Sequence, residues 1–384
     1  MKNIYQSPYL YSIFLLFFFS CKQVQKVTDI VIQPTEREKY ARNFGENDSL
    51  YIGWTSEFEI RKGDSLSIDL PYAGQGTFSS YRNEVLSYDF QLQEGERLVL
   101  ELDRVPDSSK VFVNIYDNSD SKMAGKSELF EGLVKNRRNV LVKKGTNSIY
   151  KIVLQPELSI QSEFILKIYT EATYSFPVAG HTSKNTQSFW GASRDGGKRS
   201  HEGIDIFAER GTPVVAAVDG RVRKTGEYGL GGKQVWLKEG MFGNSLYYAH
   251  LDSIAVETGK SVKIGDTLGF VGNTGNARTT APHLHFGIYQ GYHGAINPFP
   301  FIKETEFINI EAETIAISGT IKSPKANIRI GPSTIYAIII TLEEASEVEI
   351  LSKSNDWYQI VLPSGLRGFI HESLIVEKAE DLSA

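Results

Sequence analysis

A period-two alternation of apolar and polar residues is the feature that most restricts the fold of this chain. Between Leu50 and Thr170 the alternating runs are short, rich in β-branched and aromatic residues, and separated by polar breaks. Successive side chains of a strand point to opposite faces, so this pattern predicts an antiparallel β-sandwich over residues 50–172. The expected strands are Ser67–Leu70, Tyr88–Leu92, Leu98–Leu102, Val111–Tyr116 and Phe164–Tyr169.

The composition excludes several classes of protein. The chain has 384 residues, a formal net charge of −5 and 41% hydrophobic residues, which suits two or three packed domains and not a disordered chain. An acidic balance argues against a protein that coats polyanions, so no nucleic-acid partner is expected. The single cysteine, Cys21, excludes an intramolecular disulfide and a cysteine-based zinc finger.

The N-terminal stretch has the features of an export signal. A lysine precedes an apolar run from Tyr9 to Phe19, which is too short to span a membrane but suits the core of a signal peptide. The run ends in the letters FFSC, which resemble the lipobox of bacterial lipoproteins, although the two phenylalanines depart from the usual leucine and small residue. The resemblance implies a signal peptide at 1–20, a lipid on Cys21 that holds the chain to a membrane, and a polar tether at 21–49. The alternative is a buried or free thiol behind an uncleaved segment.

The segment from residue 173 to residue 303 has a different character. Between Gly191 and Pro300 lie 20 of the 34 glycines and five of the seven histidines. Dense glycine among short β-runs indicates tight turns and close approaches of the backbone. We therefore expect the chemistry of the protein in this segment.

Four histidines and one aspartate stand out there. Asp205 follows His201 by four residues, His250 ends an apolar run, and His283 and His285 alternate within another. Neutral imidazole and carboxylate are common zinc ligands, and three such groups plus water would form an open tetrahedral site. Because side chains alternate along a strand, His283 and His285 are expected to face the same cavity.

His201 and Asp205 require a bend between them before they can share one ion. A straight strand would hold their Cα atoms about 13 Å apart. Gly203 lies at the midpoint and permits such a bend freely. A helical zinc motif does not fit, because it would need a second histidine where Asp205 stands. Any single histidine is more often an ordinary core or surface residue. That is the role expected for His181, His293 and His371.

The motifs of this segment occur in a characteristic order. They are Phe189-Trp190-Gly191, His201-x-x-x-Asp205, Gly211–Ala217, Tyr248-Ala249-His250-Leu251, Gly265-Asp266, Gly272–Gly275 and His283-Leu284-His285-Phe286. The set resembles peptidase family M23, the lysostaphin-like or LytM-type zinc metallopeptidases that cut the peptides of peptidoglycan. A departure is Ala281, where the family often has glycine.

The resemblance implies a role for each polar residue. His201, Asp205 and His285 would bind Zn²⁺, and His250 and His283 would face the open fourth position, where they orient or deprotonate water and stabilise an oxyanion. Which of these two is the general base is left open. All five positions are filled, which favours an active enzyme over the non-catalytic relatives that bind the wall or activate amidases. A structural lipoprotein that tethers the wall is a further alternative.

Substrate and location follow from the same resemblance. It implies the stem peptides of peptidoglycan as substrate, in a cell envelope, on the periplasmic side of a membrane, with the outer membrane favoured. The bond between D-Ala and meso-diaminopimelate is favoured over a glycine-containing bridge, and the oligomeric state is unknown. Four aromatic residues are candidates for lining a groove that binds the substrate, although such residues more often lie in the core. They are Trp190, Trp236, Tyr247 and Tyr248.

Short strands return in residues 315–377. The letters NIRIGPS, DWYQI and GLRGFI resemble the bacterial SH3 domain, which implies a small β-barrel that recognises wall peptide or orients its neighbour. With a linker at 304–314 and a tail at 378–384, the chain is expected to be mostly β. It would comprise an N-terminal β-sandwich acting as a spacer, a central antiparallel-β M23 peptidase domain at 173–303 and a C-terminal SH3-like barrel.

Overall fold

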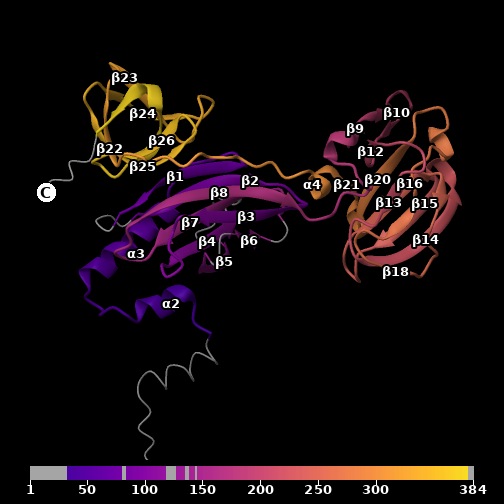
Figure 1. The fold of residues 1–384 in the computed structure, drawn as a ribbon, viewed down its shortest axis with the longest axis horizontal. Helices are drawn as coiled ribbons and strands as arrows, with labels where there is room; N and C mark the ends of the chain where they lie inside the picture. Colours follow the sequence, from indigo (N-terminus) through magenta and orange to yellow (C-terminus); the bar gives the residue numbers. More distant parts are fainter. Residues whose placement is uncertain (1–32, 80–83, 118–126, 135–137, 143–144, 379–384) are drawn as a thin grey trace, which may run out of the picture. The chain divides into compact units, whose positions relative to one another are not determined.

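The computed structural model shows a mostly β protein (Figure 1). It describes residues 33–79, 84–117, 127–134, 138–142 and 145–378. The expected signal peptide and Cys21 lie outside these residues. In the described part of the chain, no helix has both the length and the apolar character needed to cross a membrane.

Among the described residues, two helices precede the first strand, and neither was predicted. Helix α2 (Glu36–Ala41) begins with a capping box made by Thr35 and Glu38, within the expected tether. Helix α3 (Ser49–Lys62) occupies the start of the segment that was expected to contain only strands, and the side chain of Asp48 caps its first turn. A capping side chain satisfies amide groups that have no partner within the helix, which fixes where each helix begins.

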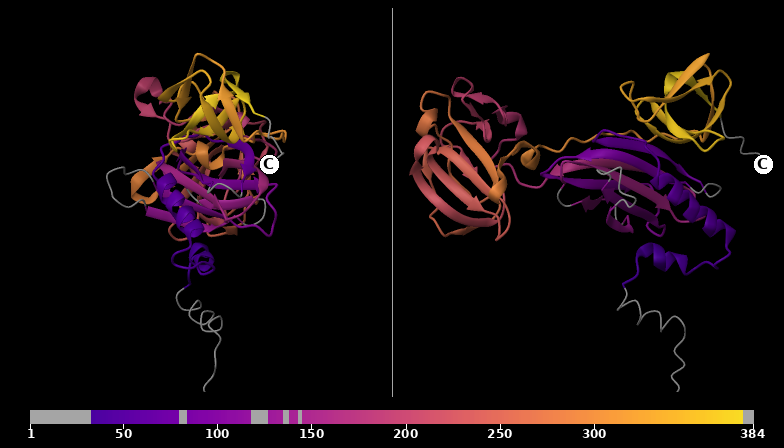
Figure 2. Two further views of the ribbon diagram at one scale, coloured as in Figure 1. Left: turned by 90° about the vertical axis from the view of Figure 1, so that its left-hand side faces the viewer. Right: turned by 180° about the vertical axis from the view of Figure 1, so that it is seen from behind.

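Helix α3 is attached to the sandwich by a buried tryptophan. Trp54 is 2% exposed, and its indole nitrogen donates to the carbonyl of Pro156 at 2.8 Å. The side-chain amide of Gln155 donates back to the carbonyl of Trp54, also at 2.8 Å. The helix therefore lies beside the strands of the sandwich, as the additional views show (Figure 2).

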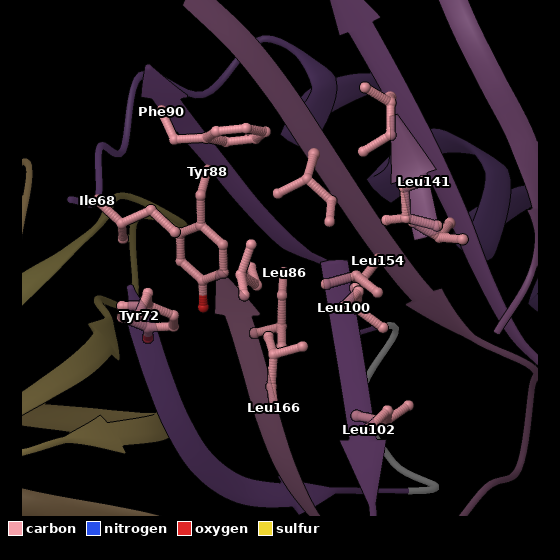
Figure 3. Packing of buried hydrophobic residues seen from close by; sticks show 14 of the residues in the cluster. Ile68, Tyr72, Leu86, Tyr88, Phe90, Leu100, Leu102, Leu141, Leu154 and Leu166 are labelled. Atoms are coloured by element: carbon pink, nitrogen blue, oxygen red, sulfur yellow. The ribbon is translucent and has the colours of Figure 1, made fainter. Parts of the chain in front are cut away.

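The sandwich consists of two antiparallel sheets. One has the order β2 (Leu86–Leu92), β7 (Ser148–Pro156), β4 (Val111–Asp117) and β5 (Ser127–Leu133). The other has the order β1 (Tyr72–Phe78), β8 (Ser162–Ala172), β3 (Glu96–Asp103) and β6 (Arg138–Val142). The two sheets share one core. Leu86 and Leu154 of the first sheet lie in the same buried cluster as Leu100 and Leu166 of the second (Figure 3).

Four of the five predicted strands fall within β2, β3, β4 and β8. The prediction for Ser67–Leu70 was wrong, because this segment makes only an isolated bridge from Ser67 to Asp89. Pro71 follows it and has no amide hydrogen to donate to a ladder.

The histidine-rich segment folds around a second core. Its larger sheet has the order β18 (Ser261–Val262), β14 (Gly220–Tyr228), β15 (Gly232–Lys238), β16 (Ser245–Leu251), β20 (His283–Gln290), β12 (Ile204–Phe207) and β9 (Thr186–Ser188), and β21 (Gly294–Ile296) also pairs with β20. A smaller sheet contains β13 (Pro213–Val215), β19 (Thr267–Phe270) and β17 (Ser253–Ile254). A short hairpin of β10 (Ser193–Arg194) and β11 (Arg199–Ser200) precedes β12, and the short helix α4 (Phe299–Ile302) follows β21.

The C-terminal segment has a third core, formed by residues such as Ile328, Ile360 and Ile370. Its strands are β22 (Ser318–Ile321), β23 (Lys325–Arg329), β24 (Ile338–Glu343), β25 (Glu347–Ser354), β26 (Trp357–Val361), β27 (Arg367–His371) and β28 (Ile375–Glu377). Among the described strands, the hydrogen-bonded order β24-β23-β27-β26-β25 does not close into a ring.

This C-terminal segment is joined to the sandwich by backbone and side-chain contacts. Strand β25 pairs with β1, and Gly76 lies opposite Ser352. The hydroxyl of Tyr88 donates to Gln359 Oε1 at 2.6 Å. Phe369 is completely buried, and it belongs to the sandwich cluster and not to the C-terminal core. The expected spacer and the SH3-like segment thus share a sheet.

The role of α3 is testable by truncating its anchor. Trp54→Ala removes a large buried side chain and leaves a cavity, which typically costs about 3–5 kcal/mol of unfolding free energy. Leu50→Ala in the same helix is the matched control, because Leu50 is 66% exposed and its loss should cost less than about 0.5 kcal/mol. Urea unfolding of the two variants measures the difference. Equal unfolding free energies would show that α3 is not part of the folded sandwich.

Candidate metal centre and its cavity

The register of three neighbouring strands brings the predicted residues together. Strand β20 lies between β12 and β16, and Asp205 on β12 stands directly opposite His285 on β20. His283 stands opposite Phe207 on the same pair of strands. Opposed residues of an antiparallel pair share a face, so these polar side chains project from one side of the sheet. This register agrees with the prediction that His283 and His285 face one cavity. Both residues line the cavity described below.

His201 reaches the group through the predicted bend. The chain turns at Gly203 before β12 begins, and His201 Nε2 lies 3.1 Å from Asp205 Oδ1. The reason for glycine at this position differs from the prediction. A Cβ at position 203 would lie 2.6 Å from His285 Cε1 and 2.7 Å from the carbonyl oxygen of Phe286. Gly203 does not have a positive φ, so glycine is required here by the close packing of the imidazole ring and not by freedom of the backbone.

Three side-chain atoms form a compact triangle. His201 Nε2 and His285 Nδ1 are 3.0 Å apart, and Asp205 Oδ1 lies 3.1 Å from the first and 3.0 Å from the second. Tetrahedral zinc with nitrogen and oxygen ligands at their usual bond lengths separates its ligand atoms by about 3.3 Å. A slight opening of the triangle therefore fits the residues to Zn²⁺, and two imidazoles with one carboxylate are a donor set that zinc accepts.

The charge states of these groups suit a cation. Burial raises the pKa of Asp205, but hydrogen bonds with His201 and His285 outweigh it and hold that pKa well below its usual range. Burial lowers the pKa of His285, although the adjacent Asp205 opposes this effect. Zinc binds carboxylate and neutral imidazole, and the directions of the pKa shifts of Asp205 and His285 favour these forms.

His250 and His283 are held in the same tautomer by the main chain. His250 Nδ1 lies 2.9 Å from the carbonyl oxygen of Thr274, and His283 Nδ1 lies 2.8 Å from that of Ala281. A carbonyl oxygen only accepts, so each Nδ1 carries the proton. In the neutral form of each ring the lone pair is therefore on Nε2, and the two ring centroids are 5.1 Å apart. Burial, followed by the charges of His285 and His283, lowers the pKa of His250 to about 4, so its ring is neutral at pH 7.

An unusual backbone angle contributes to the position of His250. Its φ is +63°, a left-handed value that costs most residues with a side chain about 1–3 kcal/mol. The preceding residue, Ala249, stands opposite His285 and so shares its face. In a regular strand His250 would then point to the other face. The left-handed turn at the end of β16 instead leaves His250 in contact with the rings of His283 and His285.

These side chains line a cavity of about 520 Å³. All five predicted site residues border it, whereas His181, His293 and His371 do not. Of the aromatic candidates, Tyr247 lines the cavity. Tyr248 is completely buried, and its hydroxyl accepts a hydrogen bond from the amide of Ala217. Trp190 and Trp236 are not among the residues that line it.

Sequence reasoning missed further residues of the cavity wall. They include Ser188, Arg194, Arg199, Glu202 and Tyr289. Arg194 contacts a predicted metal ligand directly, because its Nη2 lies 2.7 Å from Asp205 Oδ2. Nothing near position 194 in the sequence signals this contact, because Arg194 and Asp205 belong to two different sheets.

Comparison with known proteins identifies two segments. The sequence pattern of Peptidase family M23 matches residues 199–298, and that of the bacterial SH3 domain matches residues 324–376. The L-Ala–D-Glu endopeptidase of Bacillus subtilis (strain 168) is 34% identical over 145 residues, which are 35% of this chain and 44% of the relative. The glycyl-glycine endopeptidase ALE-1 of Staphylococcus capitis is 37% identical over 113 residues, which are 28% of this chain and 30% of the relative.

A solved structure is also similar. The catalytic domain of lysostaphin from Staphylococcus simulans is 34% identical to a segment covering 30% of this chain and 90% of that structure, with a TM-score of 0.28. The chain spans less than half the length of the two relatives above. Both pattern matches lie inside the segments that the sequence motifs indicated. Residues 199–298 therefore form a domain of peptidase family M23, and residues 324–376 form a bacterial SH3 domain.

Proposed function

We propose that this protein is a zinc-dependent endopeptidase that hydrolyses the peptide cross-links of peptidoglycan. The observation that carries the proposal is the triangle of His201, Asp205 and His285, whose ligand atoms lie 3.0 to 3.1 Å apart beside two further imidazoles. The similar proteins from Bacillus subtilis and Staphylococcus capitis are both named as endopeptidases, which supports the same type of reaction here.

Each residue has a distinct task in the proposed reaction. His201, Asp205 and His285 would hold Zn²⁺, which supplies a positive charge that polarises a peptide carbonyl and acidifies water. His250 and His283 both line the cavity, and in its neutral form each would have its lone pair on Nε2 because Nδ1 donates to a main-chain carbonyl. One of them would accept a proton from the attacking water and deliver it to the departing amine. The other would accept a hydrogen bond from the same water and so orient it, and the ring that holds the transferred proton would donate a hydrogen bond to the oxygen that becomes negative. Proton transfer by such groups typically contributes a factor of about 10² to 10⁴.

The location of the enzyme is part of the proposal. The FFSC letters that end in Cys21 support a lipid anchor, and such an anchor would hold the enzyme in a cell envelope, on the periplasmic side of a membrane, with the outer membrane favoured. There it would meet stem peptides. We retain the bond between D-Ala and meso-diaminopimelate as the favoured target, and the domain limits 50–172, 173–303 and 315–377 as proposed boundaries.

Hydrolysis and mere binding are separated by one experiment. The purified protein is incubated with cross-linked peptidoglycan, with and without a chelator, and the muropeptides are separated. We expect cross-linked dimers to disappear only when zinc is present. Unchanged dimers together with retained sedimentation on the wall would instead identify a non-catalytic wall-binding or amidase-activating protein.

Single substitutions separate metal binding from catalysis. Asp205→Ala and His285→Ala should remove both zinc and activity, because each deletes one corner of the triangle. His250→Ala and His283→Ala should retain much of the zinc and lose turnover by about 10²-fold or more. Zinc content by elemental analysis and release of muropeptides measure the two properties. Zinc loss in His283→Ala with retention in His285→Ala would reverse the assigned roles.

The packing of the bend gives an independent test. Gly203→Ala places a methyl group against the ring of His285, and such overpacking typically costs about 1–3 kcal/mol. We expect lower stability in urea and weaker zinc retention. Gly45→Ala is the control, since a Cβ at position 45 would meet nothing within 4 Å. If Gly203→Ala retained zinc as well as the control, close packing would not explain this glycine.

A further inference from the structure

Arg194 lies against the proposed metal ligands without being one of them. It ends strand β10, and its side chain is 30% exposed. Its Nη2 atom lies 2.7 Å from Asp205 Oδ2, 2.5 Å from Ser188 Oγ and 3.0 Å from His201 Nδ1. The other carboxylate oxygen, Oδ1, is the one that faces His201 Nε2 and His285 Nδ1.

Counting hydrogens determines which of these contacts are hydrogen bonds. A guanidinium Nη2 has two hydrogens and accepts none, so it can serve two of its three neighbours. His201 Nδ1 also lies 3.0 Å from the carbonyl oxygen of Phe189, which only accepts. If His201 offers its Nε2 lone pair to a metal, its proton must be on Nδ1 and must go to that carbonyl. With His201 in that tautomer, Arg194 donates to Asp205 Oδ2 and Ser188 Oγ.

This arrangement leaves one oxygen of Asp205 for the metal. Ser188 stands opposite Asp205 in the pairing of β9 with β12, so Arg194 connects the carboxylate to the neighbouring strand. A carboxylate with one oxygen bound to a guanidinium cannot rotate to present both oxygens to an ion without losing a charge-assisted hydrogen bond. We propose that Arg194 is a positioning residue that holds Asp205 with a single oxygen directed at the metal ligands. The inference rests on the proposed zinc site.

The direction in which zinc affinity changes when Arg194 is replaced distinguishes a positioning role from a purely electrostatic one. The guanidinium is positive, so by its field alone it would repel a metal cation, and its removal would tighten zinc binding. If its main effect is to orient the carboxylate, removal should weaken binding, because loss of a partner behind a metal ligand typically costs about 10- to 100-fold in metal affinity. The two effects thus predict opposite changes.

The experiment measures zinc affinity of the full chain by competition with a chromogenic chelator. Arg194→Met keeps the length of the side chain without its donors, and we expect an affinity about 10- to 100-fold lower than that of the unsubstituted protein. Arg194→Lys restores one charged donor and should recover part of the loss.

Arg199→Met is the matched control. Arg199 stands opposite Arg194 in the β10–β11 pairing and lines the same cavity, so this variant removes the same charge from the same hairpin. We expect it to bind zinc within about twofold of the unsubstituted protein, well below the loss typical of a ligand partner.

Cobalt substitution gives a readout that does not depend on activity. Visible absorption of Co²⁺ is stronger in four-coordinate than in five-coordinate sites, so a carboxylate freed to bind through both oxygens should weaken the absorption in Arg194→Met. If that variant does not fold, as judged by circular dichroism, Arg194→Lys and Ser188→Ala are used, and each should show a smaller shift in the same direction.

Failure of the positioning role and failure of the proposed function give different results. Equal or tighter zinc binding by Arg194→Met, or an equal loss in Arg199→Met, would overturn the positioning role while leaving the endopeptidase proposal standing. Failure of the unsubstituted protein to bind zinc would overturn the proposed function itself.

Discussion

The alignment of Asp205 with His285 across β12 and β20 is the constraint on which the metal centre depends. A shift of one residue would turn every side chain of β12 to the other face and remove the carboxylate from the imidazoles. The opposite face of the same two strands prevents this. Ile204, Ile206 and Leu284 are completely buried there, and a shift would exchange them with polar residues. The hydrophobic core thus fixes the chemistry by fixing the register.

Part of this site could be predicted from the sequence, because it depends on local periodicity. Alternation alone placed His283 and His285 on one face, and a glycine midway between His201 and Asp205 indicated the bend. The contribution of Arg194 could not be predicted in this way. Its contact with Asp205 joins two different sheets, and neither spacing nor residue type indicates that arrangement. The left-handed backbone at His250 is equally hidden, since few residues other than glycine adopt it.

In the fold, too, elements marked by local periodicity were predicted and elements that depend on distant contacts were not. Strands with clear alternation were found where expected, such as Leu98–Leu102 within β3. Helix α3 was missed because apolar residues occur on its exposed side as well as its buried side: Leu50, Ile52 and Ile60 are all exposed, whereas Trp54 and Phe58 are buried. Its stable position depends on Trp54 reaching the carbonyl of Pro156, a partner 102 residues away. No reading of a helical period would reveal that contact.

The carbonyl groups behind His250 and His283 have a consequence for sequence variation. Their oxygens belong to Thr274 and Ala281, and a peptide carbonyl is present whatever side chain a residue carries. Replacement of Ala281 by another residue would therefore leave the proton on the same nitrogen. The orientation of both rings would then tolerate side-chain changes at positions 274 and 281, provided that the path of the backbone is preserved. Alignments that score only side-chain identity would undervalue those two positions.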